Sequence, residues 1–483
     1  MVKRLVLLLP LLCIALSANA QEGVERLAPF AHGAGRTYAV TARGLDAVGL
    51  NPALLAYGTP RAFELVIAPI SSFGISSGSS LSSINNISSA FKTDSVTGNS
   101  TLLDQFYHNQ VSADLSARIF GLSFSTASIG TFAVTWDVHA AFRSVIPDAL
   151  LNYVHPPQDT ANFVLGTILP PQQVDVQGVW YNEYGISYGK TFFAGSEPGD
   201  ADIAGGLTLS YVQGIAYMRV NPSSFVSFHE PGIPNPPQSH TNIQTQYSIQ
   251  FSTSDAFNGK LPNGLSLDLL SGSTAGSGIG VSPAIAVSET PVAGQSPRWR
   301  FGLSVTDIGS IRWTSHTDVR RQDSANVIIY TQPQGGGSFS EDSIRSYLKQ
   351  LGGKLDTTDA PFTSSLPTTL HIAAALDLSV LGIDIPNSSL SVASEFAYGF
   401  TDVVGSPQKG RFGLAAIFDR PSTSIAFHTA VGITTQEGTT SLTVALGAGI
   451  GNAFFLDLGT SNISGLFSST GRPDFAAGMK ILF

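Results

Sequence analysis

The last nine residues of the chain, Phe475 to Phe483, alternate between larger apolar side chains and smaller or more polar ones. One face would carry Phe475, Ala477, Met479, Ile481 and Phe483, and the other would carry Ala476, Gly478, Lys480 and Leu482. Side chains of a β-strand point alternately to opposite faces, so this pattern predicts a strand with one apolar face. Alternation alone fits a half-buried strand of a soluble protein equally well. The rest of the chain must decide whether this apolar face contacts membrane lipid or the core of a soluble protein.

The first twenty residues have the layout of a secretory signal peptide. Lys3 and Arg4 precede an apolar run over residues 5–16, and an Ala-x-Ala cleavage site ends at Ala20. We expect residues 1–20 to be removed. The chain's one cysteine, Cys13, leaves with them. The mature protein then has no disulfide and depends on hydrogen bonding and burial.

The composition favours a membrane protein that crosses the bilayer with strands. Charged residues make up 12% of the chain, about half the usual share, while hydrophobic residues make up 43%. No apolar run after the signal approaches the ~20 residues of a membrane helix. Apolar residues spread over alternate positions are typical of transmembrane β-barrels. A secreted soluble β-sandwich or adhesin is an alternative, but its strands would be short with charged outer faces, which this chain mostly lacks.

The charge balance excludes one class of partner. Without the signal, 23 basic residues face 34 acidic ones, a net charge of −11. A strongly acidic chain is a poor ligand for the phosphate backbone of a nucleic acid. We therefore expect no nucleic-acid partner.

Fifteen segments after residue 60 have the pattern of strands separated by turn-rich stretches. They cover residues 61–76, 111–126, 131–146, 178–194, 201–220, 241–254, 278–290, 297–315, 364–380, 389–404, 410–419, 423–434, 440–450, 453–460 and 473–483. Several reach the ~10 residues that a tilted membrane strand needs. Bacterial barrels usually have an even number of strands, so one segment is missed or surplus.

Residues 21–60 precede the first strand and form a non-barrel segment. Gly44-Leu45-Asp46, followed by Asn51-Pro52-Ala53 and a short apolar helix, resembles the N-terminal plug of the FadL-like outer-membrane barrels. Residues 301–313 and 366–372 resemble an uncharacterised, PorV-like branch of that superfamily. Asn and Pro also suit the first turn of an ordinary surface helix, so that interpretation stays open for Asn51 and Pro52.

The resemblance implies an all-β fold, a transmembrane antiparallel barrel of 14 strands (16 is the alternative) over residues 61–483, with a short plug segment over residues 21–60. It also implies passive transport of hydrophobic small molecules across the outer membrane of a Gram-negative bacterium, with no enzyme activity, cofactor or metal. The alternative is a non-transporting structural or docking barrel of a secretion or surface-assembly system. The plug-motif residues are Gly44, Asp46, Asn51, Pro52 and Ala53, and the C-terminal assembly signal is Phe475, Met479, Ile481 and Phe483.

The same resemblance sets the expected partners. They are outer-membrane lipid, the barrel-assembly machinery during biogenesis, and either a hydrophobic small molecule or a surface or secretion protein.

Residues 316–362 form an insertion between two predicted strands. Ser338 and Glu341 make a capping box, and Gly352 ends the apolar pattern, which predicts a helix over residues 338–352. With 14 strands counted from a periplasmic N-terminus, the insertion falls on the periplasmic side.

Catalytic motifs are weak in this chain. Gly74-Ile75-Ser76-Ser77-Gly78 matches G-x-S-x-G, and His32-Gly33-Ala34-Gly35 resembles an oxyanion-hole loop. The serine elbow requires a following helix, whereas residues 79–86 are rich in Ser and Asn and have little helix propensity. The nine histidines show no metal-binding spacing. We therefore expect no hydrolase and no metal site.

Aromatic and charged residues within the strands predict which face is which. We expect the aromatic set at strand ends or on the lipid face: Tyr184, Tyr188, Tyr211, Tyr217, Trp299, Trp313 and Phe400. We expect the charged set in the lumen: Asp137, Arg143, Arg219, Asp307, Arg312, Glu395 and Lys480. Pairing of these charges with Arg43 and Asp46 would hold the plug in place.

Overall fold

The computed structural model describes most of the chain after the signal region. The described residues are 28–57, 62–77, 111–126, 128–145, 169–220, 225–229, 239–254, 274–291, 296–331, 356–358, 360–407, 410–422, 424–436, 439–451, 453–463 and 474–483. The predicted signal peptide with Cys13 and the predicted helix over residues 338–352 lie outside them. No helix among the described residues is long and apolar enough to cross a membrane.

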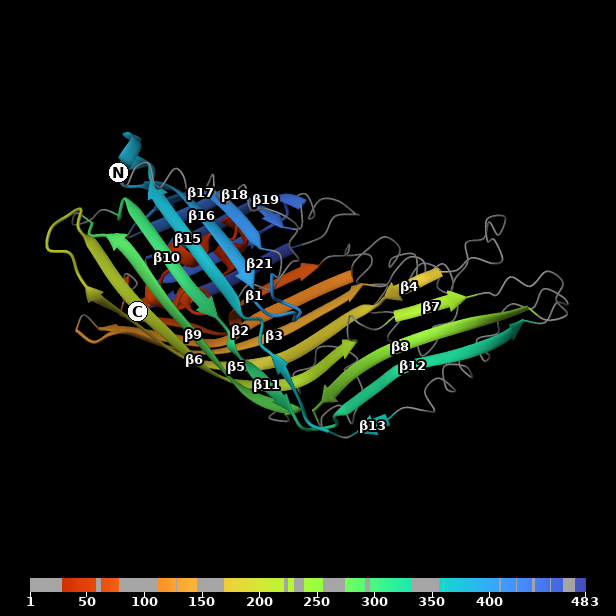
Figure 1. The fold of residues 1–483 in the computed structure, drawn as a ribbon. Helices are drawn as coiled ribbons and strands as arrows, with labels where there is room; N and C mark the ends of the chain where they lie inside the picture. The colour runs from red at the N-terminus through yellow and green to blue at the C-terminus, as the bar shows by residue number, and fades with distance from the viewer. Residues whose placement is uncertain are drawn as a thin grey trace.

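The strands form a closed antiparallel β-barrel (Figure 1). Its wall consists of β1 (Phe63–Ser77), β2 (Val111–Thr126), β3 (Gly130–Val145), β5 (Asp175–Phe193), β6 (Ala201–Val220), β9 (Gly276–Glu289), β10 (Trp299–Thr306) with β11 (Ile308–Trp313), β14 (Phe362–Ser365) with β15 (Thr369–Asp377), β16 (Ser389–Gly399), β17 (Arg411–Arg420), β18 (Ile425–Gln436), β19 (Thr439–Ile450), β20 (Phe454–Thr460) and β21 (Asp474–Leu482). Pairing of β1 with β21 closes the ring. The predicted all-β barrel of 14 strands is confirmed.

Five further strands form an arm that projects from one end of the barrel, on the right in Figure 1. They are β4 (Leu169–Gln173), β7 (Phe225–His229), β8 (Ser239–Thr253), β12 (Asp318–Thr331) and β13 (Asp356–Thr358). The arm continues the wall, because β8 pairs with the last five residues of β6 and then with β12. Residues 241–254 are therefore the surplus segment among the fifteen that were predicted.

This surplus strand also explains an error in the predicted side of the 316–362 insertion. β1 begins beside the C-terminus, where the Phe63 amide donates to the Phe483 carbonyl at 2.9 Å. Counting β8 as a wall strand places the insertion at that same end. Without β8, seven wall positions precede the insertion, so it leaves from the opposite end, where the arm lies.

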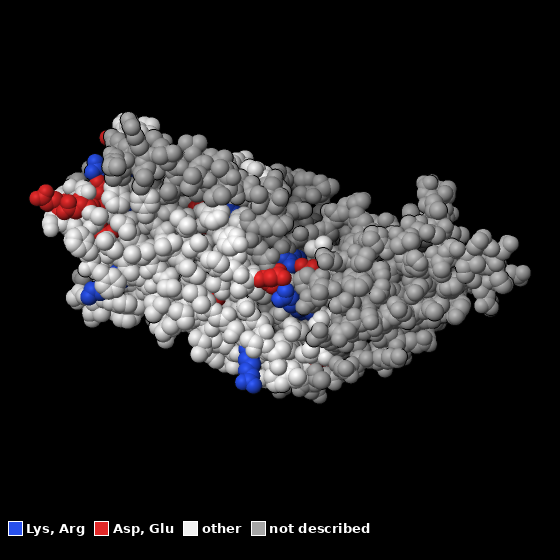
Figure 2. Space-filling view, in the orientation of Figure 1, with Lys and Arg blue, Asp and Glu red and all other residues white. Residues whose placement is uncertain are grey.

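The outer face of the barrel is apolar. Figure 2 shows a broad face almost free of charge, with Lys, Arg, Asp and Glu gathered toward its edges. Large aliphatic side chains stand exposed on it, among them Ile186, Ile279, Ile425 and Ile450. At the end that carries the C-terminus, an aromatic belt follows five neighbouring wall positions, from the end of β21 to β5. Its ring centroids lie 4.8–6.3 Å apart, and its members are Phe483, Phe63, Phe124, Phe132 and Tyr188. This distribution matches the lipid-facing wall of a membrane barrel.

The N-terminal segment, residues 28–57, lies in the barrel interior, and we call it the plug. It contains α2 (Pro29–Gly33), η1 (Tyr38–Val40), η2 (Gly44–Ala47) and η3 (Pro52–Tyr57), and most of its residues are buried. Small wall residues let it approach closely: a Cβ at Gly413 would lie 1.8 Å from the Gly35 carbonyl oxygen. The Gly and Ala residues on the inner wall thus face the plug backbone instead of water.

Two irregularities reverse the side-chain alternation within strands. Ile215 is an extra residue in β6 opposite the Trp180–Tyr181 step of β5. Asp307 separates β10 from β11 and has a φ of 60°. A one-residue slip moves every following side chain to the other face. Tyr217 and Trp313 consequently point inward, and their rings lie 5.2 Å apart.

Candidate functional site: the plugged lumen

The plug is fixed to the wall by buried polar groups. Arg118 of β2 donates to the Leu45 carbonyl at 2.6 Å and to the Val48 carbonyl at 3.2 Å. The same guanidinium bonds to Asp137 of β3 at 2.8 and 3.1 Å. This arrangement uses the planar fork of arginine, which presents several donors at once. Arg118 thus links two plug carbonyls to a wall carboxylate, and it is fully buried.

Acidic wall residues bind the plug amides. Glu64 of β1 accepts from the Leu45 amide at 2.7 Å, and Glu395 of β16 accepts from the Ala39 amide at 3.0 Å. Glu395 also bonds to His371 of β15 at 2.9 Å. These carboxylates satisfy amides that the short 3₁₀ turns leave unpaired.

Two charge clusters complete the attachment of the plug. Lys480 of β21 contacts Asp46 of the plug. Asp474, also on β21, accepts from Arg36 at 2.8 Å and contacts His32 at 3.1 Å. Arg43 does not follow the predicted pattern: it donates to the Ala42 carbonyl at 2.7 Å and lies over the Tyr57 ring. Burial lowers the pKa of the Arg43 guanidinium.

The plug-motif residues occupy buried positions. Gly44, with a φ of 55°, and Asp46 lie in η2. Asn51 donates to the Ala39 carbonyl at 2.9 Å and accepts from the Ala53 amide at 3.1 Å, so it caps η3 and also joins two parts of the plug. Asn51 and Pro52 are buried, so they do not begin a surface helix.

The C-terminal residues lie on one outward face of β21. Phe475, Met479 and Ile481 are partly exposed there, and Phe483 is 57% exposed. Their role as an assembly signal stays a prediction.

Most of the predicted lumen charges do point inward. Asp137, Arg143, Asp307 and Glu395 are buried. Arg312 was predicted to face the lumen, but it is exposed. Tyr217 and Trp313 show the opposite error, because they were expected at the lipid face or strand ends and are buried. All three follow one of the two slips in alternation. Tyr184, Tyr211 and Phe400 are exposed as predicted.

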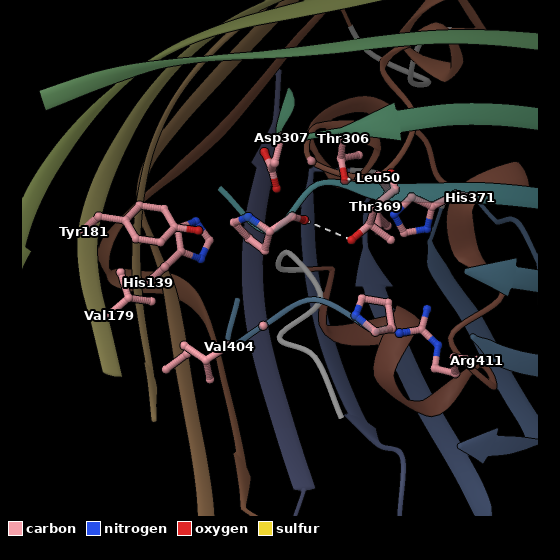
Figure 3. A pocket seen from close by; sticks show the side chains of 15 residues that line it. Leu50, His139, Val179, Tyr181, Thr306, Asp307, Thr369, His371, Val404 and Arg411 are labelled. Atoms are coloured by element: carbon pink, nitrogen blue, oxygen red, sulfur yellow. Dashed lines mark hydrogen bonds between the residues drawn. The ribbon is translucent and has the colours of Figure 1, made fainter. Parts of the chain in front are cut away.

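A small cavity lies beside the plug (Figure 3). Its volume is about 30 Å³, and its lining includes Leu50 of the plug, His139, His371, Arg411 and Val404. A water molecule needs roughly 10–15 Å³ by this measure, so the cavity has room for about two waters. This cavity therefore admits no molecule much larger than water.

The cavity borders a break in the wall. Asp307 and Pro367 both line it, and they lie where β10 meets β11 and where β14 meets β15. Side chains replace ladder bonds here: Ser282 accepts from the Asp307 amide at 3.0 Å, and Thr368 donates to the Asp307 carbonyl at 2.8 Å. Residues 297–315 were predicted as one strand. The Asp within an otherwise apolar strand was the available signal, because Asp tolerates positive φ better than most residues.

The G-x-S-x-G match lies only partly within the described residues. Ser76 of the G-x-S-x-G match lies within β1, opposite Asp474 of β21, and Gly78 lies outside the described residues. Among the residues with described positions, no group of three or more His, Cys, Asp or Glu side chains is arranged to hold a metal ion.

Residues 56–466 match the model of a protein family described as a family of unknown function, DUF5723. No curated protein matches the sequence. Similar solved structures include a TodX deltaS2S3 mutant monoaromatic hydrocarbon channel, with 9% identity, a TM-score of 0.42 and coverage of 95% of this chain and 98% of that one. Another is the Pseudomonas putida toluene transporter TodX, with 8% identity, a TM-score of 0.39 and coverage of 96% and 98%.

The chain therefore has structural similarity to TodX, a FadL-family outer-membrane transporter, over nearly its whole length. The narrower resemblance to a PorV-like branch stays a prediction.

Proposed function

The chain belongs to the DUF5723 family, and we propose that its barrel lies in the outer membrane and lets small hydrophobic molecules pass through the plugged lumen. The apolar outer face and the aromatic belt support a place in a membrane. Residues 1–20 would act as a signal peptide that directs export of the chain and is then removed. The protein needs no chemical step for this function.

The break in the wall beside the cavity carries the proposal. Where ladder pairing is interrupted, the wall can separate at a smaller cost than elsewhere, because fewer backbone bonds must break. A molecule that reaches the cavity would then leave sideways into the apolar layer without crossing the plug. The present cavity of about 30 Å³ is too small for such a molecule, so passage requires an opening movement.

The test uses the positive φ of Asp307. Asn tolerates this backbone conformation, whereas a β-branched residue does not, at a cost of about 1–3 kcal/mol. We expect Asp307→Val to straighten the wall and reduce uptake of an uncharged fluorescent aromatic probe by cells that carry the protein. Asp307→Asn is the matched control and should keep uptake near that of the unmodified protein. Equal uptake by both variants, with equal amounts of folded barrel, would contradict a route through the break.

The arm favours a second candidate, a docking barrel. Its strands β8 and β12 extend the wall well beyond the barrel end (Figure 1), and a projecting sheet is suited to hold a partner protein. Mass spectrometry of the protein purified in mild detergent separates the two candidates. A stoichiometric apolar compound supports transport, and a stoichiometric protein partner with no small molecule supports docking. Absence from the outer-membrane fraction would contradict both.

A further inference from the structure

Residues 400–407, which follow β16, form a segment that we call the strap. It starts at the wall break, where the Phe400 amide donates to the Thr368 carbonyl and the Thr401 hydroxyl donates to the Leu366 carbonyl, both at 2.9 Å. It then turns into the barrel, and Val403, Val404, Ser406 and Pro407 are buried. A connection between two neighbouring strands has no need to enter the lumen, so this course calls for an explanation.

The strap bonds to strands on the far side of the lumen. Asp402 accepts from Arg219 of β6 at 2.7 Å and lies 3.7 Å from Arg143 of β3. The Val404 amide donates to Gln177 of β5 at 2.9 Å. Three wall positions separate β16 from β6, namely β15, β10 and β9. The strap therefore spans the lumen instead of following its rim.

The strap and the plug together enclose the cavity. Val404, Gly405 and Pro407 line it from one side, and Gly49 and Leu50 of the plug line it from the other. Figure 3 shows Val404 between Val179 on one wall and Arg411 on the opposite wall. Arg219, to which the strap bonds, belongs to the part of β6 that pairs with the arm, so the strap lies on the arm side of the cavity.

The strap is held more weakly than the plug. Asp402 is 45% exposed and Arg219 is 24% exposed at the side chain, and ion pairs of this kind contribute little because water screens them. The plug is held by ion pairs with side-chain exposures of 15% or less, such as Arg36–Asp474 and Lys480–Asp46. Of these two barriers, the strap opens at the smaller cost.

We propose that the strap is the gate of the lumen, latched by Asp402 on Arg219 and Arg143 and by the Val404 amide on Gln177. Release of the latch moves residues 400–407 off the plug and opens the cavity, while the plug stays in place. This inference rests on the proposed function, because a gate is useful only if small molecules pass through the lumen. Its test measures access to the lumen and does not depend on transport.

The test places a thiol behind the strap. Leu50 is 2% exposed, and Cys13 is the chain's one cysteine, so Leu50→Cys in a Cys13→Ala background carries a single buried thiol. The probe is a small, charged thiol reagent added to the full chain in detergent. We expect slow labelling of this thiol in this background. Adding Asp402→Asn should make labelling roughly three- to fivefold faster, because this ratio corresponds to the free energy of a partly exposed ion pair.

Two controls make the result specific. Asp384→Asn removes a carboxylate from an exposed turn between β15 and β16 and should leave the labelling rate unchanged. Asp402→Glu keeps the charge and should restore slow labelling. If Asp402→Asn reduces the amount of folded barrel, Gln177→Leu removes the acceptor for the Val404 amide and should accelerate labelling in the same way.

Two results would overturn the gate. Equal labelling rates with and without Asp402→Asn and Gln177→Leu would show that the latch does not control access. Fast labelling in the unmodified background would show that the strap does not close the cavity. If labelling follows the latch but no aromatic probe is taken up, the gate stands and the proposed transport fails.

Discussion

At the scale of single residues, arginine is the side chain best suited to attach the plug to the inner wall. The inner wall must hold plug carbonyls and wall carboxylates at once, away from bulk water, and one guanidinium has donors for both. Arg118 meets this need, with two bonds to plug carbonyls and two to Asp137. Its position within a strand predicts that Asp137 faces the lumen but does not identify Arg118 as its partner, because alternation shows a face and not a pair.

Replacement of this arginine should loosen the plug. Arg118→Met leaves the Asp137 carboxylate buried without its cation, which costs about 3–5 kcal/mol. Arg118→Met with Asp137→Asn should recover part of this loss, because no charge is then left unpaired. Denaturant unfolding of the refolded proteins measures both. A double variant as unstable as the single one would contradict the assignment of the pair.

At the scale of strands, alternation predicted most of the wall and failed at two slips. Every wall strand was found as a segment, but the facing of Tyr217, Arg312 and Trp313 was reversed. Ile215 and Asp307 cause these reversals. Ile gives no signal of a bulge in a single sequence, whereas the signal that Asp307 offered was not used. β8 was counted as a wall strand because its length and turn-bounded pattern resemble those of the wall. Local pattern thus finds strands but not their partners.

The strand glycines that face the plug should not accept a side chain. A Cβ at Gly413 of β17 would lie 1.8 Å from the Gly35 carbonyl oxygen, so Gly413→Ala must displace the plug, at about 1–3 kcal/mol. Gly178 of β5 is the matched control, because a Cβ there meets nothing closer than 3.5 Å, so Gly178→Ala should be tolerated. Hydrogen exchange of the Gly35 amide, which donates to Thr443, reports plug displacement. Equal protection in both variants would refute this prediction.

At the scale of the whole molecule, closure depends on the C-terminal strand. Phe483 exchanges backbone hydrogen bonds with Phe63 at 2.9 and 3.0 Å, and their rings stack with centroids 6.0 Å apart. The sequence predicted this strand and its outward face from nine residues. It also predicted that lumen charges pair with Asp46 of the plug, and Lys480 contacts Asp46. The other plug attachments and the course of the strap were not predicted, because partners such as Ala39 and Glu395, or Gln177 and Val404, are far apart in the sequence.

The variant Phe483→Ala distinguishes two roles of this residue: closing the barrel, and being recognised by the assembly machinery. The backbone bonds remain, so we expect the purified variant to refold in detergent to within about 1 kcal/mol of the unmodified protein, given the exposure of this ring. In cells we expect less assembled barrel, if the terminal aromatic is read by the assembly machinery. Phe427→Ala, on the outer face of β18, is the control and should assemble normally. Normal assembly of Phe483→Ala would disprove the predicted signal.

The close contact between plug and wall also has a consequence for the order in which the barrel assembles. Gly33 lies so close to Val444, and Gly459 so close to Pro29, that no methyl group fits between the two backbones. A segment packed this tightly cannot slide past its neighbours through a finished ring. We therefore expect residues 28–57 to be in place before β21 pairs with β1 and closes the barrel.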